Sequence, residues 1–257
     1  MKYKAVIADV DGTLIAPNAG PLTIASQNVI SAVHKAVGKG IYFSIATARS
    51  INWITGLVES LHVNAPLILD NGARIYDPKT QKYLFESYLS ERKVIEVLAV
   101  LKKYNVKITL VPHENELARF DYVEGEKYAL DDLVKIIVLH ISSQLSESVY
   151  QSLTKLDGIQ VTKSISGHSP IKESVHVTSF NAAKGKALQW ITHYLHISKD
   201  EIIGIGDSYN DEEFLKECGL KVAMGNSVPE ILKIADYIAP SYEEDGVADV
   251  LDKFILK

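Results

Sequence analysis

Disulfide chemistry is absent from this chain of 257 residues, because Cys218 is its only cysteine. A single cysteine fits a reducing compartment, so we expect a cytoplasmic protein. No apolar run approaches the roughly 20 residues that cross a bilayer, and the apolar stretch at the N-terminus is too short for a signal peptide. Internal repeats and low-complexity tracts are also missing. The sequence therefore predicts an ordinary soluble protein without a membrane partner.

The chain also lacks a basic charge balance, since its formal net charge is -5. Proteins that bind nucleic acid nonspecifically usually carry a basic face, so we expect no nucleic-acid partner. A small anionic substrate stays compatible with this charge, because a bound metal ion can override the global balance locally. The length allows one large domain or two modest ones.

What the sequence does contain, at its very start, is a short apolar run that ends in two carboxylates. Residues 3–8 are typical of a buried strand, and Asp9–Val10–Asp11–Gly12–Thr13 follows at once. Burying unpaired carboxylates is costly, so such a pair calls for a cation or a reaction. Ligands of α/β proteins bind at the carboxyl ends of strands. This position makes the pair a candidate site.

The outer parts of the chain alternate between strand-like and helix-like segments. The expected strands are residues 3–8, 41–46, 66–69, 202–206, 220–224 and 237–239. The expected helices are residues 23–37, with Thr23 as the N-cap, and 50–61, 183–196, 211–218 and 228–235. Strands separated by helical crossovers predict an α/β fold with a Rossmann-like parallel-sheet core and helices on both faces.

The middle of the chain has a different pattern, in which strands crowd together. Expected strands lie at 106–111, 134–141, 159–163 and 174–177, with helices at 91–104 and 146–156. This pattern predicts a small α+β domain with a mainly antiparallel sheet. We therefore expect a core built from residues 1–82 and 180–257, interrupted by an inserted cap domain at 83–179.

Polar side chains gather where the expected core strands end. They are Asp9 and Asp11, Thr47 and Arg49, Asp70 and Asn71, residues 207–211, and Asn226. In a parallel sheet these positions share one edge. Any one of them could simply cap a helix, but capping does not require so many acids together. The set as a whole predicts a functional site.

Four of these segments resemble, in order, the motifs of the haloacid dehalogenase-like (HAD) superfamily, whose members are mostly phosphatases. Residues 9–13 resemble its D-x-D-G-T signature, and Thr47 its hydroxyl residue after the second strand. Lys184, followed by glycine, resembles its lysine ahead of the fourth strand, and residues 206–211 resemble its G-D-x-x-N-D motif.

The insertion resembles the type-two cap of class IIB, the Cof-type sugar-phosphatase group, whose N-G-A segment is also similar to residues 71–73. One departure concerns the second motif, which often reads T-G-R in that group. Here Ala48 takes the place of the glycine and adds a methyl group where the backbone would approach a phosphate. Arg49 could then reach the phosphate or form a salt bridge on the core surface.

The resemblance implies a Mg²⁺-dependent phosphomonoester hydrolase that forms an aspartyl-phosphate. Asp9 would be the nucleophile, and Asp11 the general acid and then the general base. Metal ligands would come from Asp9, the backbone carbonyl of Asp11, Asp207 and, directly or through water, Asp211. Contacts to the substrate phosphate would come from Thr47, Ala48, Arg49 and Lys184. Gly12, Asn71 and Asn210 would support the site.

The substrate is a small phosphorylated metabolite that the sequence does not name. Sugar phosphates are the commonest substrates of the group, and phosphoglycolate is an alternative. Candidate contacts to the leaving group are His113, Glu114, Asn115, Arg119, His168 and Ser169.

Functions of other kinds also stay open: a phosphomutase of the phosphomannomutase type, and a noncatalytic regulator that binds a phospholigand. A glycosyltransferase with a D-x-D metal site would need neither Lys184 nor the acids at 207–211. The oligomeric state, monomer or homodimer, is undetermined by the sequence.

Overall fold

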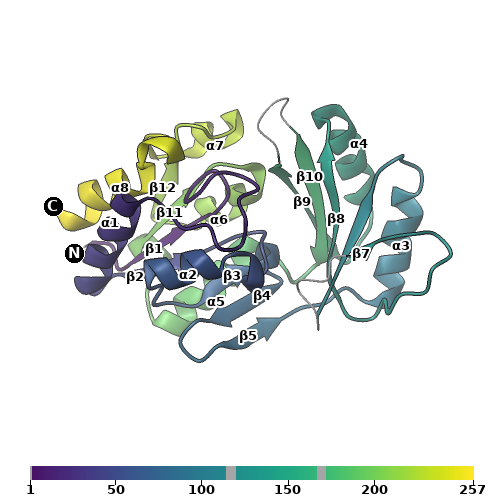
Figure 1. Cartoon of the computed structure of the whole chain (residues 1–257), viewed down its shortest axis with the longest axis horizontal. Coiled ribbons are helices and arrows are strands. Elements are labelled where there is room, and N and C mark those ends of the chain that lie inside the picture. The colour runs from purple at the N-terminus through teal and green to yellow at the C-terminus, as the bar shows by residue number, and fades with distance from the viewer. Residues whose placement is uncertain (1, 114–119, 167–171) are drawn as a thin grey trace.

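The structure, a computed structural model, describes residues 2–113, 120–166 and 172–257. It contains a parallel sheet between helices and, beside it, a second, antiparallel sheet with helices on its far side (Figure 1). Of the expected leaving-group contacts, Glu114, Asn115, Arg119, His168 and Ser169 lie outside the described residues. None of the helices in the described ranges has the length and apolar character that spanning a membrane requires.

The first sheet, called the core sheet below, has the strand order β13-β12-β11-β1-β2, and every neighbouring pair is parallel. Its strands are β1 (Ala5–Ala8), β2 (Tyr42–Ile45), β11 (Ile202–Gly206), β12 (Leu220–Ala223) and β13 (Tyr237–Ile238). β1 and β11 are buried along their whole length, which explains their continuous apolar runs. Because β1 pairs with both β2 and β11, segments from the N-terminal and C-terminal parts of the chain meet at the centre of one sheet.

Helices cover both faces of the core sheet, as the sequence predicts. One face carries α1 (Gln27–Gly38), α2 (Thr55–Leu61) and α8 (Gly246–Leu251), and the other carries α5 (Lys184–Leu195), α6 (Glu212–Lys216) and α7 (Pro229–Ile234). Each set packs its apolar side chains into a separate buried cluster against the sheet. The predicted fold class is confirmed.

The third expected strand pairs differently from the prediction. β3 (Leu67–Leu69) meets β2 at one parallel bridge and forms its own antiparallel sheet with β4 (Arg74–Asp77) and β5 (Lys82–Glu86). The strand at 66–69 and its parallel alignment with the end of β2 agree with the prediction, but its antiparallel pairing with β4 was not predicted. The cause is a sharp reversal after β3, where Asp70, Asn71 and Gly72 have φ values of 52°, 57° and 93°. Aspartate and asparagine tolerate this left-handed region better than most residues.

The second sheet, called the cap sheet below, has the order β7-β6-β8-β10-β9 and is antiparallel throughout. Its strands are β6 (Ile108–Pro112), β7 (Phe120–Asp121), β8 (Leu133–Ile141), β9 (Ile159–Ile165) and β10 (Glu173–Ser179). The helices α3 (Glu91–Leu101) and α4 (Ser143–Leu153) cover its face away from the core (Figure 1). The opposite face is turned toward the core sheet, and the site lies between them.

Several helix ends differ from the sequence-based expectation. α1 begins after Ser26, not Thr23, because the Ser26 hydroxyl accepts a hydrogen bond from the Val29 amide at 3.2 Å. The segment 50–61 is broken at Ile54 into a single 3-10 turn, Ile51–Trp53, and α2. The C-terminal helix α8 was not predicted at all.

Candidate active site

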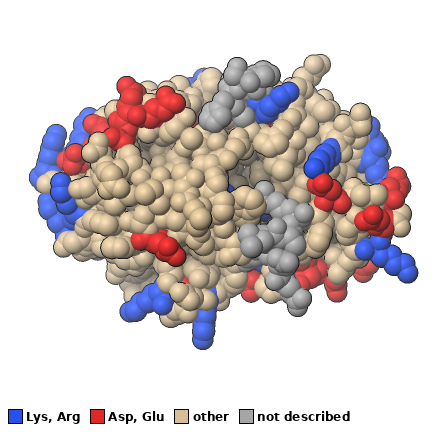
Figure 2. All heavy atoms as spheres, viewed as in Figure 1, with Lys and Arg blue, Asp and Glu red and all other residues tan. Residues whose placement is uncertain are grey.

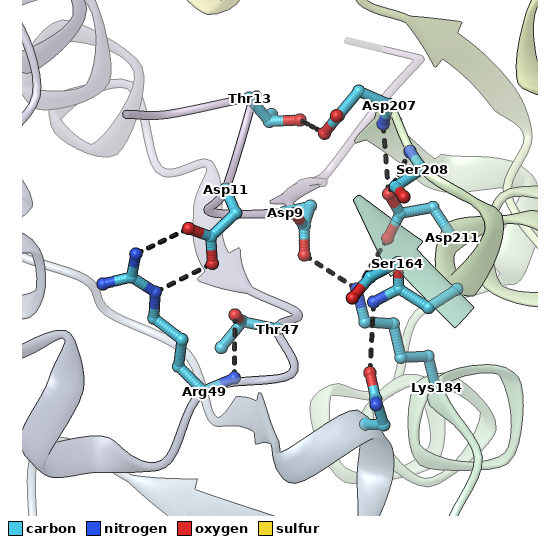
Figure 3. A network of polar contacts seen from close by, with 12 residues as sticks. Asp9, Asp11, Thr13, Thr47, Arg49, Ser164, Lys184, Asp207, Ser208 and Asp211 are labelled. Carbon is cyan, nitrogen blue, oxygen red and sulfur yellow. Dashed lines mark hydrogen bonds and ion pairs between the residues drawn. The ribbon is translucent and has the colours of Figure 1, made fainter. Parts of the chain in front are cut away.

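Asp9 lies at the floor of the site, directly after the central strand β1. Its side chain is buried, and its Oδ1 accepts a hydrogen bond from Lys184 Nζ at 2.7 Å (Figure 3). Burial, together with the negative charge of Asp211, raises the pKa of Asp9 to about 7, although Lys184 acts in the opposite direction. Without a further cation, Asp9 would therefore hold a proton near neutral pH.

Lys184, the first residue of α5, is the buried cation between two carboxylates. Its Nζ contacts Asp9 and, at 2.6 Å, Oδ1 of Asp211. Burial alone would lower the pKa of Lys184, but the charges of Asp211 and Asp9 raise it above its usual value. The lysine therefore keeps its positive charge throughout the physiological pH range.

Asp207 and Asp211 come from the loop after β11, the neighbour of β1. Asp207 Oδ1 accepts from the Thr13 hydroxyl at 2.8 Å, while Asp211 Oδ2 accepts from the amides of Asp207 and Ser208 at 3.0 and 3.1 Å. Burial and the charges of Asp9 and Asp211 raise the pKa of Asp207 well above its usual value. Gly12 is required beside this carboxylate, because a Cβ there would lie 2.4 Å from Asp207 Oδ2.

Asp9, Asp207 and Asp211 together have the donor set of a divalent-metal site. They offer carboxylate oxygens that lie within 4.8 Å of one another, and all three side chains are buried. When all three carboxyl groups are ionised, their negative charges exceed the single positive charge of Lys184 by two. Mg²⁺ prefers oxygen ligands and carries the two charges that would balance the cluster, so the residues present fit this ion.

Asp11, two residues after Asp9, faces a different partner. Arg49 holds it with a two-pronged ion pair, Nε to Oδ2 at 2.8 Å and Nη2 to Oδ1 at 2.5 Å (Figure 3). The remaining nitrogen of the guanidinium, Nη1, donates to the carbonyls of Ala19 and Trp53. Arg49 is therefore tied into the core and orients Asp11, and of the two sequence-based readings this geometry favours the salt bridge.

Thr47 follows β2 and is buried at the edge of the same site. Its hydroxyl oxygen accepts a hydrogen bond from the Arg49 amide at 3.1 Å, and its carbonyl accepts one from the Asn71 amide at 3.0 Å. Because the oxygen is already an acceptor, its own proton is available to an anion. The Thr47 side chain is thus suited to donate to a phosphate.

Asn71 and Asn210 connect the core to the cap sheet. Asn210 Nδ2 donates to Asn71 Oδ1, and Asn71 Nδ2 donates to the hydroxyl of Thr162 on β9, both at 3.1 Å. The reversal that carries Asn71 also brings Gly72 against Lys184, since a Cβ at Gly72 would lie 2.5 Å from the Ala183 carbonyl. The expected supporting residues thus hold neighbouring loops together.

A cleft opens between these loops and the cap sheet. It is lined from the core by Asp9, Asp11, Asn18, Ala48, Arg49 and Trp53, and from the cap sheet by Lys135, Ile137, Leu139, Ser164, Ser174 and His176, among others. In the space-filling view the middle of the molecule is hollowed and mostly uncharged, with charged side chains nearer the edges (Figure 2). His113 is not a lining residue and instead contacts Tyr88 and Arg74.

Several residues of this site were not predicted from the sequence. Thr13 lies inside the first motif, so its contact with Asp207 could have been expected. Lys135 also left a signal, because it is the one charge in the otherwise apolar segment 133–139. Ser164 and His176, which contact each other at 3.2 Å, gave no signal beyond the alternation of their strands.

Comparison with known proteins gives a consistent result. A family model described as haloacid dehalogenase-like hydrolase matches residues 6–251. The chain is 28% identical to the 5-amino-6-(5-phospho-D-ribitylamino)uracil phosphatase YcsE of Bacillus subtilis, over 98% of this chain and 96% of the relative. It is 26% identical to a phosphoglycolate phosphatase of Staphylothermus marinus, over 97% and 96%. The structure of the HAD subclass IIB sugar phosphatase BT4131 superposes with a TM-score of 0.77 at 21% identity, covering 98% of both chains.

Proposed function

Because this chain belongs to the haloacid dehalogenase-like hydrolase family and is one of its phosphatases, we propose that it removes phosphate from a small sugar or polyol phosphate. The observation that carries the proposal is the arrangement of Asp9. It lies beside the fixed charge of Lys184 and a cluster of buried acids, at the floor of a cleft whose other wall combines hydroxyl and imidazole groups with apolar side chains. We propose that residues 83–179 act as the cap that forms this wall.

In the proposed reaction, a carboxylate oxygen of Asp9 forms a bond to phosphorus while the bond from phosphorus to the leaving oxygen breaks. Asp11, which for this step must be protonated and released from one of its two contacts with Arg49, gives a proton to that oxygen, and the alcohol departs. Water then attacks the aspartyl-phosphate, loses its proton to Asp11 and releases phosphate, which restores both side chains. Lys184 and the Thr47 hydroxyl would stabilise the charge of the transferring group, which is the main task in phosphoryl transfer.

Mg²⁺ is the proposed cofactor, held by Asp9, the Asp11 carbonyl and Asp207. When bound, it would neutralise charge on the phosphate and on the attacking carboxylate. Both oxygens of Asp211 already accept hydrogen bonds, from Lys184 and from two amides, so we propose that Asp211 contacts the metal through water. The raised pKa of Asp9 supports the need for a cation, because a protonated carboxyl group is a poor nucleophile.

The leaving group would be neutral and rich in hydroxyl groups. Ser164, Ser174 and His176 offer hydrogen bonds in the cleft, while the cationic side chains Arg49 and Lys135 are each paired with a carboxylate. Among the described residues that line the cleft, the hydrogen-bonding side chains therefore suit hydroxyl groups of a leaving group better than a second anionic group. The relative YcsE is named for a substrate with a phosphorylated ribityl chain, which supports a polyol. Phosphoglycolate, with its carboxylate, is the weaker candidate.

A panel of phosphomonoesters tests this proposal. It should contain hexose, pentose and polyol phosphates together with phosphoglycolate, assayed with Mg²⁺ for both phosphate release and isomer formation. We expect phosphate release from the sugar or polyol phosphates, lost on chelation and reduced about 10⁴-fold or more in Asp9→Asn. Isomer formation without phosphate would indicate a mutase, and turnover retained in Asp9→Asn would rule out the nucleophile. A cytoplasmic location, which the single buried cysteine supports, completes the proposal.

A further inference from the structure

Lys135 is a fully buried cation of the cap sheet. It lies on the central strand β8 and is completely buried, on the sheet face that lines the cleft with Ile137 and Leu139. Alternate residues of the same strand, Ile136 and Val138, face α3 and α4. A buried ammonium group needs compensating charge and hydrogen bonds.

Two partners of Lys135 belong to the core. Its Nζ donates to Asp70 Oδ1 at 2.5 Å and to the Ala48 carbonyl at 2.6 Å. Asp70 is itself fully buried and accepts from the Ser50 hydroxyl at 2.6 Å. Burial alone would raise the pKa of Asp70, but Lys135 and Arg74 hold it below its usual value, so the pair is charged. The cap thus contacts the loop after β3 through a salt bridge and the loop after β2 through a hydrogen bond.

The Ala48 carbonyl belongs to the peptide group that joins Ala48 to Arg49. The N–H of the same peptide donates to the Thr47 hydroxyl oxygen at 3.1 Å. Lys135 therefore holds one side of this peptide, while the other side determines where the Thr47 hydroxyl lies. If the peptide rotated, the Thr47 oxygen would lose its donor and its proton would no longer be directed toward the site.

We propose that Lys135 is a positioning residue, through which the closed cap fixes the Ala48–Arg49 peptide and thereby aims the Thr47 hydroxyl at the substrate phosphate. The inference rests on the proposed function, because it assumes that Thr47 binds phosphate. It assigns Lys135 to the alignment of the phosphate site and not to contact with the leaving group.

Lys135→Met tests this assignment with two substrates, the best sugar phosphate of the panel and 4-nitrophenyl phosphate. We expect kcat/KM to fall by a similar factor for both, by about 100-fold, since misplacement of a phosphate contact acts on every substrate. The matched control is Lys107→Met, which removes an exposed lysine of the cap paired with Asp121 and should leave kcat/KM unchanged. A loss confined to the sugar phosphate would overturn the proposal in favour of a leaving-group contact.

The double variant Lys135→Met with Asp70→Asn removes both buried charges. It distinguishes loss of the positioning role from a general loss of folding. We expect this double variant to regain much of the melting temperature that Lys135→Met loses, while kcat/KM stays low. Recovery of kcat/KM together with the melting temperature would mean that Lys135 only neutralises Asp70.

Dependence on Thr47 is tested by a double-mutant cycle. If Lys135 acts through the Thr47 hydroxyl, adding Lys135→Met to Thr47→Ala should change kcat/KM by no more than about twofold, whereas independent residues would give additive losses. Equal turnover by wild type and Asp9→Asn would refute the proposed function instead. In that case the same double-mutant cycle is measured on the affinity for inorganic phosphate in the presence of Mg²⁺. An affinity that is unchanged in Lys135→Met would overturn the proposed role of Lys135.

Discussion

Metal-free protein should lose stability as the pH rises toward neutrality, because folding buries Asp9 in a place that disfavours its charge. The pKa of Asp9 is about 7 in the folded chain, against an ordinary value of 3.8. Between these two values the native state binds about one proton more than the unfolded state. The contribution of Asp9 to the free energy of unfolding is therefore most favourable below about pH 4, falls with rising pH and levels off above about pH 7. The raised pKa of Asp207 acts in the same direction.

The size of the effect follows from the shift. One pKa unit corresponds to about 1.4 kcal/mol, so Asp9 alone would cost the metal-free protein about 4 kcal/mol over the whole interval. Between pH 5 and pH 7, where few other carboxylates titrate, the loss should be about 2 to 3 kcal/mol. For a protein of this length that corresponds to a fall in melting temperature of roughly 5 to 10 °C.

The assay is thermal unfolding from pH 5 to pH 8 with a chelator, repeated with saturating Mg²⁺ and with Asp9→Asn. The amide that this substitution puts in place of the carboxyl group cannot ionise, so the variant without metal should show a much flatter profile and be more stable than wild type at pH 7. Mg²⁺ should raise the wild-type melting temperature most at pH 8, the upper end of the range, where binding has the fewest protons to release. Parallel profiles for wild type and Asp9→Asn without metal would refute this account of the buried acids.

Two further predictions concern the loops around the site. Gly72→Ala should destabilise the fold by several kcal/mol, because its Cβ would lie 2.5 Å from the Ala183 carbonyl at a φ of 93°. The control is Gly125→Ala, where φ is 91° and a Cβ would meet open space, so that only the backbone cost of about 1 to 2 kcal/mol should appear. Both free energies of unfolding are measured by chemical denaturation. Equal losses in the two variants would exclude the contact with Ala183 as the cause. Arg49→Met should lower kcat at least tenfold through Asp11 and leave inhibition by phosphate unchanged. Weaker inhibition with unchanged kcat would instead make Arg49 a phosphate contact.

The fold and the centre of the site could be predicted because they depend on local patterns. The apolar run before Asp9 is typical of a buried strand, and parallel strands bring their carboxyl ends to one edge, so Asp9, Thr47 and Asp207 were expected to lie near one another. The pairing of 66–69 could not be predicted in the same way. It depends on the left-handed backbone of Asp70 and Asn71, which tertiary contacts stabilise and local propensity does not reveal.

The partners of buried charges were equally hidden from the sequence. Arg49 could be assigned to phosphate or to a salt bridge, and only the position of Asp11 relative to it distinguishes the two. Lys135 lies 65 residues from Asp70 along the chain, so no spacing rule relates them. A lone charge within an apolar strand predicts that a partner exists, but the identity of the partner requires the three-dimensional arrangement.

The contacts between cap and core suggest why selection of the leaving group and alignment of the catalytic residues go together. Four loops around the site meet the cap: Asn18 Nδ2 donates to the Ser166 carbonyl, Ala48 accepts from Lys135, Asn71 donates to Thr162, and the Ser208 hydroxyl accepts from the Ile165 amide. An open cap would break all four contacts at once. A leaving group that fits the cap sheet favours closure, and closure orders the loops that hold phosphate and metal. We therefore expect poorly fitting substrates to lose kcat as well as affinity, since part of the binding energy is used to align the site.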